Sequence, residues 1–186
     1  MPIRVDAYMA EGVASGTVVR VGQLRDQLES LPDLAMTAVS WQSLDGSPAR
    51  AEREATFAVD DVLIVVADDD PVLSGHAAWH SIELEVGPYT VSGDLPTLPG
   101  FDPDRALTRP SGEFVMLRDV KLGLLDDAGE TIDCHHAMVN RYGVDRVSAD
   151  LMLGFFFPGA AMDDPKPTTG PVSTATADLD TEPLDS

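Results

Sequence analysis

The chain has little cysteine, little lysine and no long apolar run. Its one cysteine, Cys134, excludes an intrachain disulfide. The lysines are Lys121 and Lys166 alone, and 12 basic residues stand against 32 acidic ones, a net charge of −20. Nucleic acids and anionic membranes are therefore disfavoured partners, because lysine and arginine supply most of the affinity for them.

Membrane insertion and secretion are not expected either. No segment approaches the ~18 apolar residues of a membrane helix. The first residues also lack the basic and then apolar pattern of a secretory signal. Scarce lysine beside abundant alanine, aspartate, glycine and valine indicates a prokaryotic source, so we expect a cytoplasmic prokaryotic protein.

Most of the chain is patterned as short strands. In residues 79–86, Ile82, Leu84 and Val86 alternate with polar residues and would share one face of a strand. Residues 23–30 are the best match to helical spacing. Because no long helices separate the strands, they should pair antiparallel. We predict an all-β fold with a minor α component.

The composition changes near the C-terminal end. From residue 159 the chain is rich in Pro, Thr, Ala, Asp and Ser and has no aromatic residue. Such a segment buries too little apolar surface to offset its chain entropy. We predict a first β repeat with one short helix over residues 1–70, a second β repeat over 71–158, and a disordered acidic tail over 159–186.

The two β segments resemble each other in sequence. Three short segments recur in the same order in both: 15–18 matches 92–95, 39–41 matches 120–122, and 57–62 matches 142–147. Each copy would hold about five strands, and so small a sheet hides its edges by curling or by pairing with its twin. We therefore predict two tandem, five-stranded, small-barrel-like repeats.

The second copy resembles the Sm-like small β-barrel family. Gly93-Asp94-Leu95 with Phe101-Asp102 is similar to the family's first motif, and residues 138–147 are similar to its second. The resemblance implies a bent five-stranded sheet and, as one alternative function, nucleic-acid binding. That alternative would require a local basic patch made by Arg105, Arg109, Arg118, Arg141 and Arg146.

Two histidine clusters suggest another alternative, a small metal-dependent enzyme. His76 and His80 lie four residues apart, a spacing that suits a metal only on a helix. Cys134 and His136 would share one side of a strand, with His135 on the other. These four side chains could bind metal if they converge, but the leading expectation is that the protein is no enzyme and needs no cofactor.

The segment 151–158 has the most apolar sequence near the tail. It contains Phe155, Phe156 and Phe157 in succession, and three adjacent side chains on a strand cannot all face one core. With Met152, they would form an exposed patch that binds a protein partner or a second copy. Burial between the two repeats is the other interpretation. The leading prediction is a non-catalytic interaction or scaffold module.

Overall fold

The computed structural model describes residues 1–69, 77–97, 112–151, 153 and 155–163, without the side chain of Ala128. The described residues confirm the all-β prediction: they form an 11-stranded sheet, antiparallel except at its last strand, with one short α-helix. None of the described helices is long and apolar enough to cross a membrane. His76, Arg105, Arg109, Met152 and residues 164–186 lie outside the described residues.

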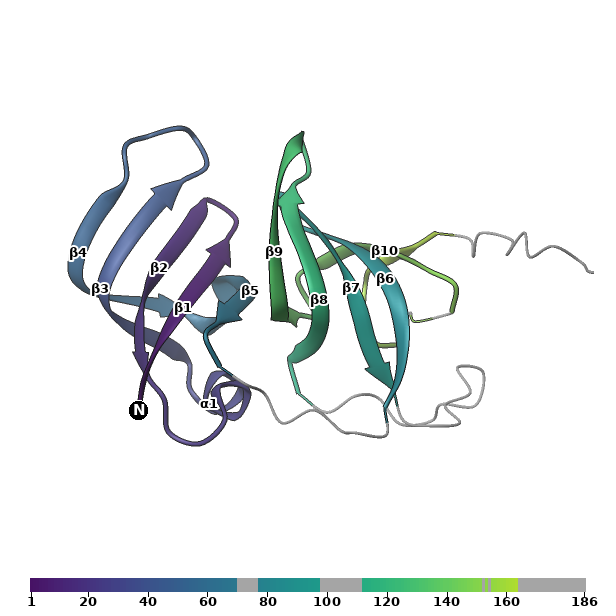
Figure 1. Ribbon diagram of the computed structural model, residues 1–186, viewed down its shortest axis with the longest axis horizontal. Coiled ribbons are helices and arrows are strands. Elements are labelled where there is room, and N and C mark those ends of the chain that lie inside the picture. Colours follow the sequence, from purple (N-terminus) through teal and green to yellow (C-terminus); the bar gives the residue numbers. More distant parts are fainter. Residues whose placement is uncertain (70–76, 98–111, 152, 154, 164–186) are drawn as a thin grey trace, which may run out of the picture.

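The N-terminal half (residues 1–69) contains five strands and a helix (Figure 1). These elements are β1 (Pro2–Met9), β2 (Gly12–Val19), α1 (Leu24–Ser30), β3 (Asp33–Ser43), β4 (Arg50–Ala58) and β5 (Val62–Ala67), with a 3-10 turn at Val59–Asp61. Helix α1 forms where apolar spacing predicts it, and its Leu24 and Leu28 are buried.

The C-terminal half (residues 77–163) contains the remaining six strands. They are β6 (Ala78–Val86), β7 (Tyr89–Thr97), β8 (Phe114–Leu124), β9 (Asp127–Asn140), β10 (Val144–Ala149) and the two-residue β11 (Ala161–Met162). Strand β11 lies within the segment expected to be a disordered tail, so that prediction is wrong for residues 159–163.

The order of strands is the same in both halves. It reads β5-β1-β2-β3-β4 in the N-terminal half and β10-β6-β7-β8-β9 in the C-terminal half. The halves meet where β9 pairs with β5, through Ile64 with Val139 and Val65 with Met138. Figure 1 shows these two strands side by side between the two groups.

The register also corresponds between the halves. Gly16 and Gly93 lie at the same irregularity, where β2 meets β3 and where β7 meets β8. A Cβ at either glycine would lie 3.0 Å from a carbonyl oxygen of the next strand. Opposite them, Ala38 and Asp119 have positive φ angles of 51° and 50°. The first two matched segments in the sequence therefore hold equivalent positions.

The third matched segment does not hold equivalent positions in the two halves, as the strand pairing shows. Val62 pairs with Met9 at the end of the first hairpin, and Val144 pairs with Val86 at the end of the equivalent hairpin. Val62 thus corresponds to Val144, not to Val147 as the sequence match suggested. The next residues correspond accordingly, with Ile64 in the place of Arg146 and Val65 in the place of Val147.

Each half has its own hydrophobic core, and each core also contains residues of the other half. Phe114 and Met138 pack into the core of the N-terminal half. Tyr8 and Ile64 pack into the core of the C-terminal half. The junction is therefore an apolar contact, because side chains from both sides are removed from water across it.

Candidate interaction edges

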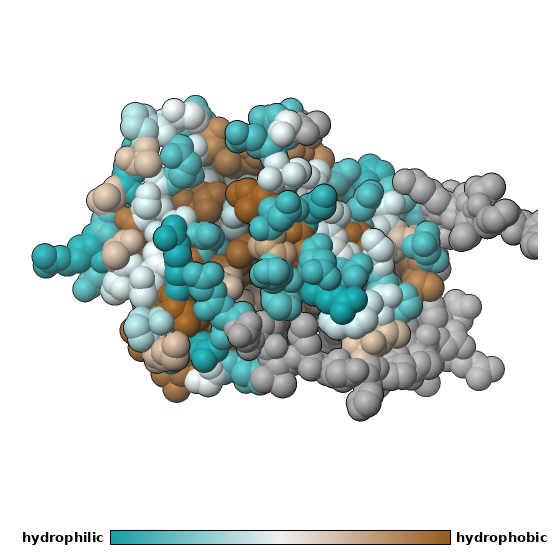
Figure 2. Space-filling view, viewed as in Figure 1, coloured by the Kyte–Doolittle hydropathy of each residue, from teal (hydrophilic) through white to brown (hydrophobic). Residues whose placement is uncertain are grey.

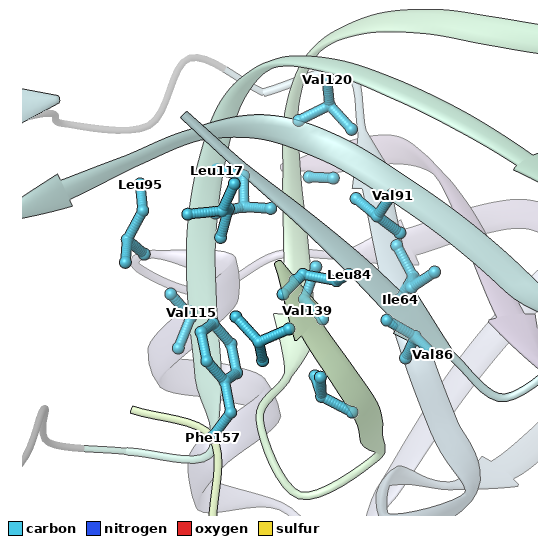
Figure 3. Packing of buried hydrophobic residues seen from close by; sticks show 14 of the residues in the cluster. Ile64, Leu84, Val86, Val91, Leu95, Val115, Leu117, Val120, Val139 and Phe157 are labelled. Atoms are coloured by element: carbon cyan, nitrogen blue, oxygen red, sulfur yellow. The ribbon is translucent and has the colours of Figure 1, made fainter. Parts of the chain in front are cut away.

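The three phenylalanines are largely inside the molecule. Phe156 is 7% exposed and Phe157 is fully buried, while Phe155 is half-buried. Figure 3 shows Phe157 beside Val115 in the core of the C-terminal half. The expected exposed cluster is therefore wrong for Phe156 and Phe157: a turn after Leu153 directs them inward instead of continuing a strand.

Arg141 secures this segment to the core. Its side chain is 2% exposed, and its guanidinium donates to the Phe155 carbonyl at 2.9 Å and to the Gly112 carbonyl at 3.3 Å. A buried charge held by backbone carbonyls positions the chain around it. Arg141 is thus a structural residue in this fold, and it does not contribute to a basic surface.

The other described arginines of the expected basic patch lie apart. Arg118 bonds to Asp94 at 3.3 Å and lies over the Trp79 ring, 3.7 Å from its centre. Arg146 bonds to Asp163 at 2.9 Å. Across the sheet, Arg146 pairs with Glu85, Glu85 with Thr90, and Thr90 with Gly123 of β8. Gly123 is five residues from Arg118 on that strand. That spacing is about 16 Å along the strand, so the two guanidinium groups form no common patch.

The described metal candidates do not meet either. His80 lies on β6, where its Nε2 hydrogen bonds to Thr97 Oγ1 at 2.9 Å. His136 lies on β9, and β7 and β8 separate these strands in the sheet. Among the described residues, no three His, Cys, Asp or Glu side chains are grouped as metal ligands.

Cys134 is not activated as a nucleophile. Burial, together with the charge of Asp133, raises the pKa of its thiol above the ordinary value. A thiol must lose its proton to attack a carbonyl carbon or to bind a metal, and a raised pKa opposes that loss. His135 is exposed while Cys134 and His136 are half-buried, as strand alternation predicts.

A cavity of about 450 Å³ lies beside the junction of the halves. Its apolar lining includes Ile3, Leu24, Met116 and Met138, and His136 borders it. Arg20, also in the lining, forms an ion pair with Asp69. The cavity combines apolar and paired charged groups without a pattern that selects one ligand.

The two ends of the sheet are its strand edges, at β4 and at β10 with β11. Strand β4 ends the sheet on one side, and its nine residues are mostly exposed. On the other side, within the described residues, the outer edge of β10 pairs only with the two-residue, parallel β11. An end strand carries unpaired backbone N–H and C=O groups, which can accept another strand. Of the features in the described residues, these edges are the most direct sites for binding a chain.

Figure 2 shows the same side of the molecule as Figure 1. Hydrophilic residues surround smaller hydrophobic patches on this face, and no single apolar surface dominates it. Comparison of the chain with protein-family models, with curated proteins and with solved structures found no match. The Sm-like resemblance therefore stays a prediction.

Proposed function

We propose that the protein is a non-catalytic interaction module that joins chains by pairing sheet edges, with a second copy of itself as the partner. The observation that supports this is the internal junction, where β9 of one half adds to β5 of the other. Strand β4 holds in the N-terminal half the place that β9 holds in the C-terminal half. Pairing β4 of one copy with β10 of the next would repeat that junction between molecules.

The residues of this intermolecular pairing follow from the register. Phe57 and Thr56 of β4 correspond to Val139 and Met138 of β9. They would therefore pair with Arg146 and Val147 of the next copy. Phe57 stacks on Trp41, with ring centres 6.0 Å apart. An arginine brought against such rings gains a cation–π contact.

The pairing between copies should be weaker than the junction within one chain. Met138 and Phe114 are buried in the internal junction, whereas the equivalent residues of the open edge, Thr56 and Asp33, are polar or charged. Each missing apolar side chain removes about 1.5–3 kcal/mol of burial. Copies with a net charge of −20 also repel one another. Association should therefore depend on concentration and strengthen with salt.

Head-to-tail pairing has a defined geometric consequence. A contact between two different surfaces of identical chains forms a ring if the rotation closes and a filament if it does not. Charge favours a protein partner over a nucleic acid, because the net charge is −20. In addition, Arg118, Arg141 and Arg146 are spread apart and are bonded to carboxylates or carbonyl groups. The module would therefore build an assembly and carry out no reaction.

Sedimentation velocity on the full chain from about 1 μM to about 1 mM tests this proposal. The mass should rise above the 19.8 kDa of one chain as concentration and salt increase. Thr56→Asp should abolish the rise, because it buries a charge in the new junction. Ser40→Asp adds the same charge at an exposed residue of β3, an inner strand, and should leave it intact. The proposal would be refuted if the two variants behaved equally. It would also be refuted if the wild-type mass stayed at that of one chain at every concentration.

A further inference from the structure

Strand β11 pairs with β10 at the positions where β9 pairs with β5. In the internal junction, Ile64 and Val65 of β5 pair with Val139 and Met138 of β9. The equivalent residues of β10, Arg146 and Val147, pair with Ala161 and Met162 of β11. The Asp163 amide also donates to the Val147 carbonyl at 2.9 Å. The C-terminal segment thus occupies the place of a docked neighbour.

The same segment also fills the core beneath that edge. Phe114 and Met138 come from the docked half and complete the core of the N-terminal half. Leu153, Phe156 and Phe157 are buried in the core of the C-terminal half. Residues 153 and 155–163 therefore supply both features of the internal junction, an added strand and bulky apolar side chains.

We propose that β11 is an intramolecular cap on the β10 edge, which β4 of a second copy must displace before the two molecules join. This inference rests on the proposed function and adds its regulation. The cap runs parallel to β10 and is two residues long, whereas β9 joins its edge antiparallel. Parallel pairing is the less stable arrangement per residue, so exchange is possible.

The side-chain attachment of the cap is exposed. Arg146 binds Asp163 at 2.9 Å and Glu85 at 3.5 Å, with side chains 50%, 41% and 38% exposed in that order. Exposed ion pairs are screened by salt. Salt should therefore release the cap under the same conditions that reduce repulsion between the copies. Phe157 stays buried in the core and retains the preceding segment when β11 leaves.

The test compares Asp163→Pro with Asp180→Pro in the full chain. Asp163→Pro removes both the amide that donates to Val147 and the carboxylate that binds Arg146. Asp180→Pro makes the same chemical change at a position well beyond β11 in the sequence. The mass of each variant is measured against concentration by sedimentation velocity. A matched far-ultraviolet spectrum and melting temperature establish that each variant folds.

The expected result is association of Asp163→Pro at a concentration about tenfold lower than wild type, with Asp180→Pro unchanged. Adding Thr56→Asp to Asp163→Pro should abolish that association. If wild type and Asp163→Pro associate equally and Thr56→Asp still abolishes the assembly, the cap is refuted and the proposed function stands. If no form associates at any concentration, the proposed function fails and the cap fails with it.

Discussion

Tyr8 of β1 and Tyr89 of β7 meet edge to face across the junction, with ring centres 5.4 Å apart and planes at 87°. The Tyr89 hydroxyl donates to the carbonyl of Met9 at 2.8 Å and lies 3.3 Å from that of Gly12. Both carbonyls belong to the first hairpin of the other half. The junction thus has an aromatic contact and hydrogen bonds in addition to the β5–β9 pairing.

Tyr89→Phe should lower the free energy of unfolding by about 1–2 kcal/mol, because it removes a buried hydrogen bond between the two halves. The aromatic ring and its contact with Tyr8 would remain. Urea unfolding followed by tryptophan fluorescence measures the change. Tyr142→Phe is the matched control, since that ring is 62% exposed and should change stability little. Equal losses in the two variants would contradict a role for the Tyr89 hydroxyl.

Alkaline pH should weaken the same junction. Burial first, and then the charges of Asp6 and Cys134, raises the pKa of Tyr8 from 10 to about 12. Burial and the neighbouring Tyr8 raise the pKa of Tyr89 above 10 as well. Folding therefore favours the protonated phenols. Their contribution to stability is complete below pH 10 and decreases as the pH rises from 10 towards 12.

The measurement is the free energy of unfolding in urea at a series of pH values above 9. Wild type should lose stability steadily above pH 10, and Tyr89→Phe should lose less over the same interval because one titrating group is gone. A pH dependence identical in the two proteins would show that Tyr89 does not take part in the alkaline transition.

Gly16 and Gly93, the glycines at the two equivalent strand irregularities or bulges, should be similarly sensitive to substitution. A Cβ at Gly93 would lie 3.0 Å from the Arg118 carbonyl and 3.1 Å from Val120, and one at Gly16 would meet Thr37 and Met36 in the same way. Each Gly→Ala change should cost about 1–3 kcal/mol, because the next strand must move. Thermal unfolding measures the cost, with Ser92→Ala as the control. A large cost at only one glycine would contradict the equivalence of the two bulges.

Local pattern predicted much of this fold because alternation and turn residues are local properties. The all-β class, helix α1 and the matched Ser-Gly segments could be predicted in that way. The ladder register near Val62 could not, because it depends on pairing with Met9, far away in the sequence, and the local apolar pattern does not show that pairing. Strand β11 was not accessible either: two residues carry no periodicity, and tertiary contacts with Val147 and Arg146 determine its position.

The candidate site was harder to predict than the fold. Sequence alternation shows that three adjacent phenylalanines cannot share a face of a strand, but it does not show that the chain leaves the strand. Phe157 is buried because a turn after Leu153 and the carbonyl contact of Arg141 redirect the segment. The open edge at β4 depends on strand order, and strand order is determined by long-range pairing.

Phe157→Ala should destabilise the fold far more than Phe155→Ala. Phe157 is fully buried in the core of the C-terminal half, so truncation leaves a cavity and costs about 3–5 kcal/mol. Phe155 is half-buried and should cost less. Urea unfolding of both variants measures the difference. If Phe157→Ala left stability unchanged and altered only the mass of the assembly, the aromatic segment would be an interface and not part of the core.

Thr56→Met should strengthen association between copies. It places at the open edge the residue that the internal junction has at Met138, which is 5% exposed in the core of the other half. Burying that side chain contributes about 1.5–3 kcal/mol, so the dissociation constant should fall by about tenfold or more. Ser40→Met adds the same side chain to the exposed face of an inner strand and tests for non-specific stickiness. Sedimentation velocity at matched concentrations measures both. An equal gain in the two variants would mean that apolar surface alone drives association, whereas a gain confined to Thr56→Met is expected only if β4 docks in the register of the internal junction.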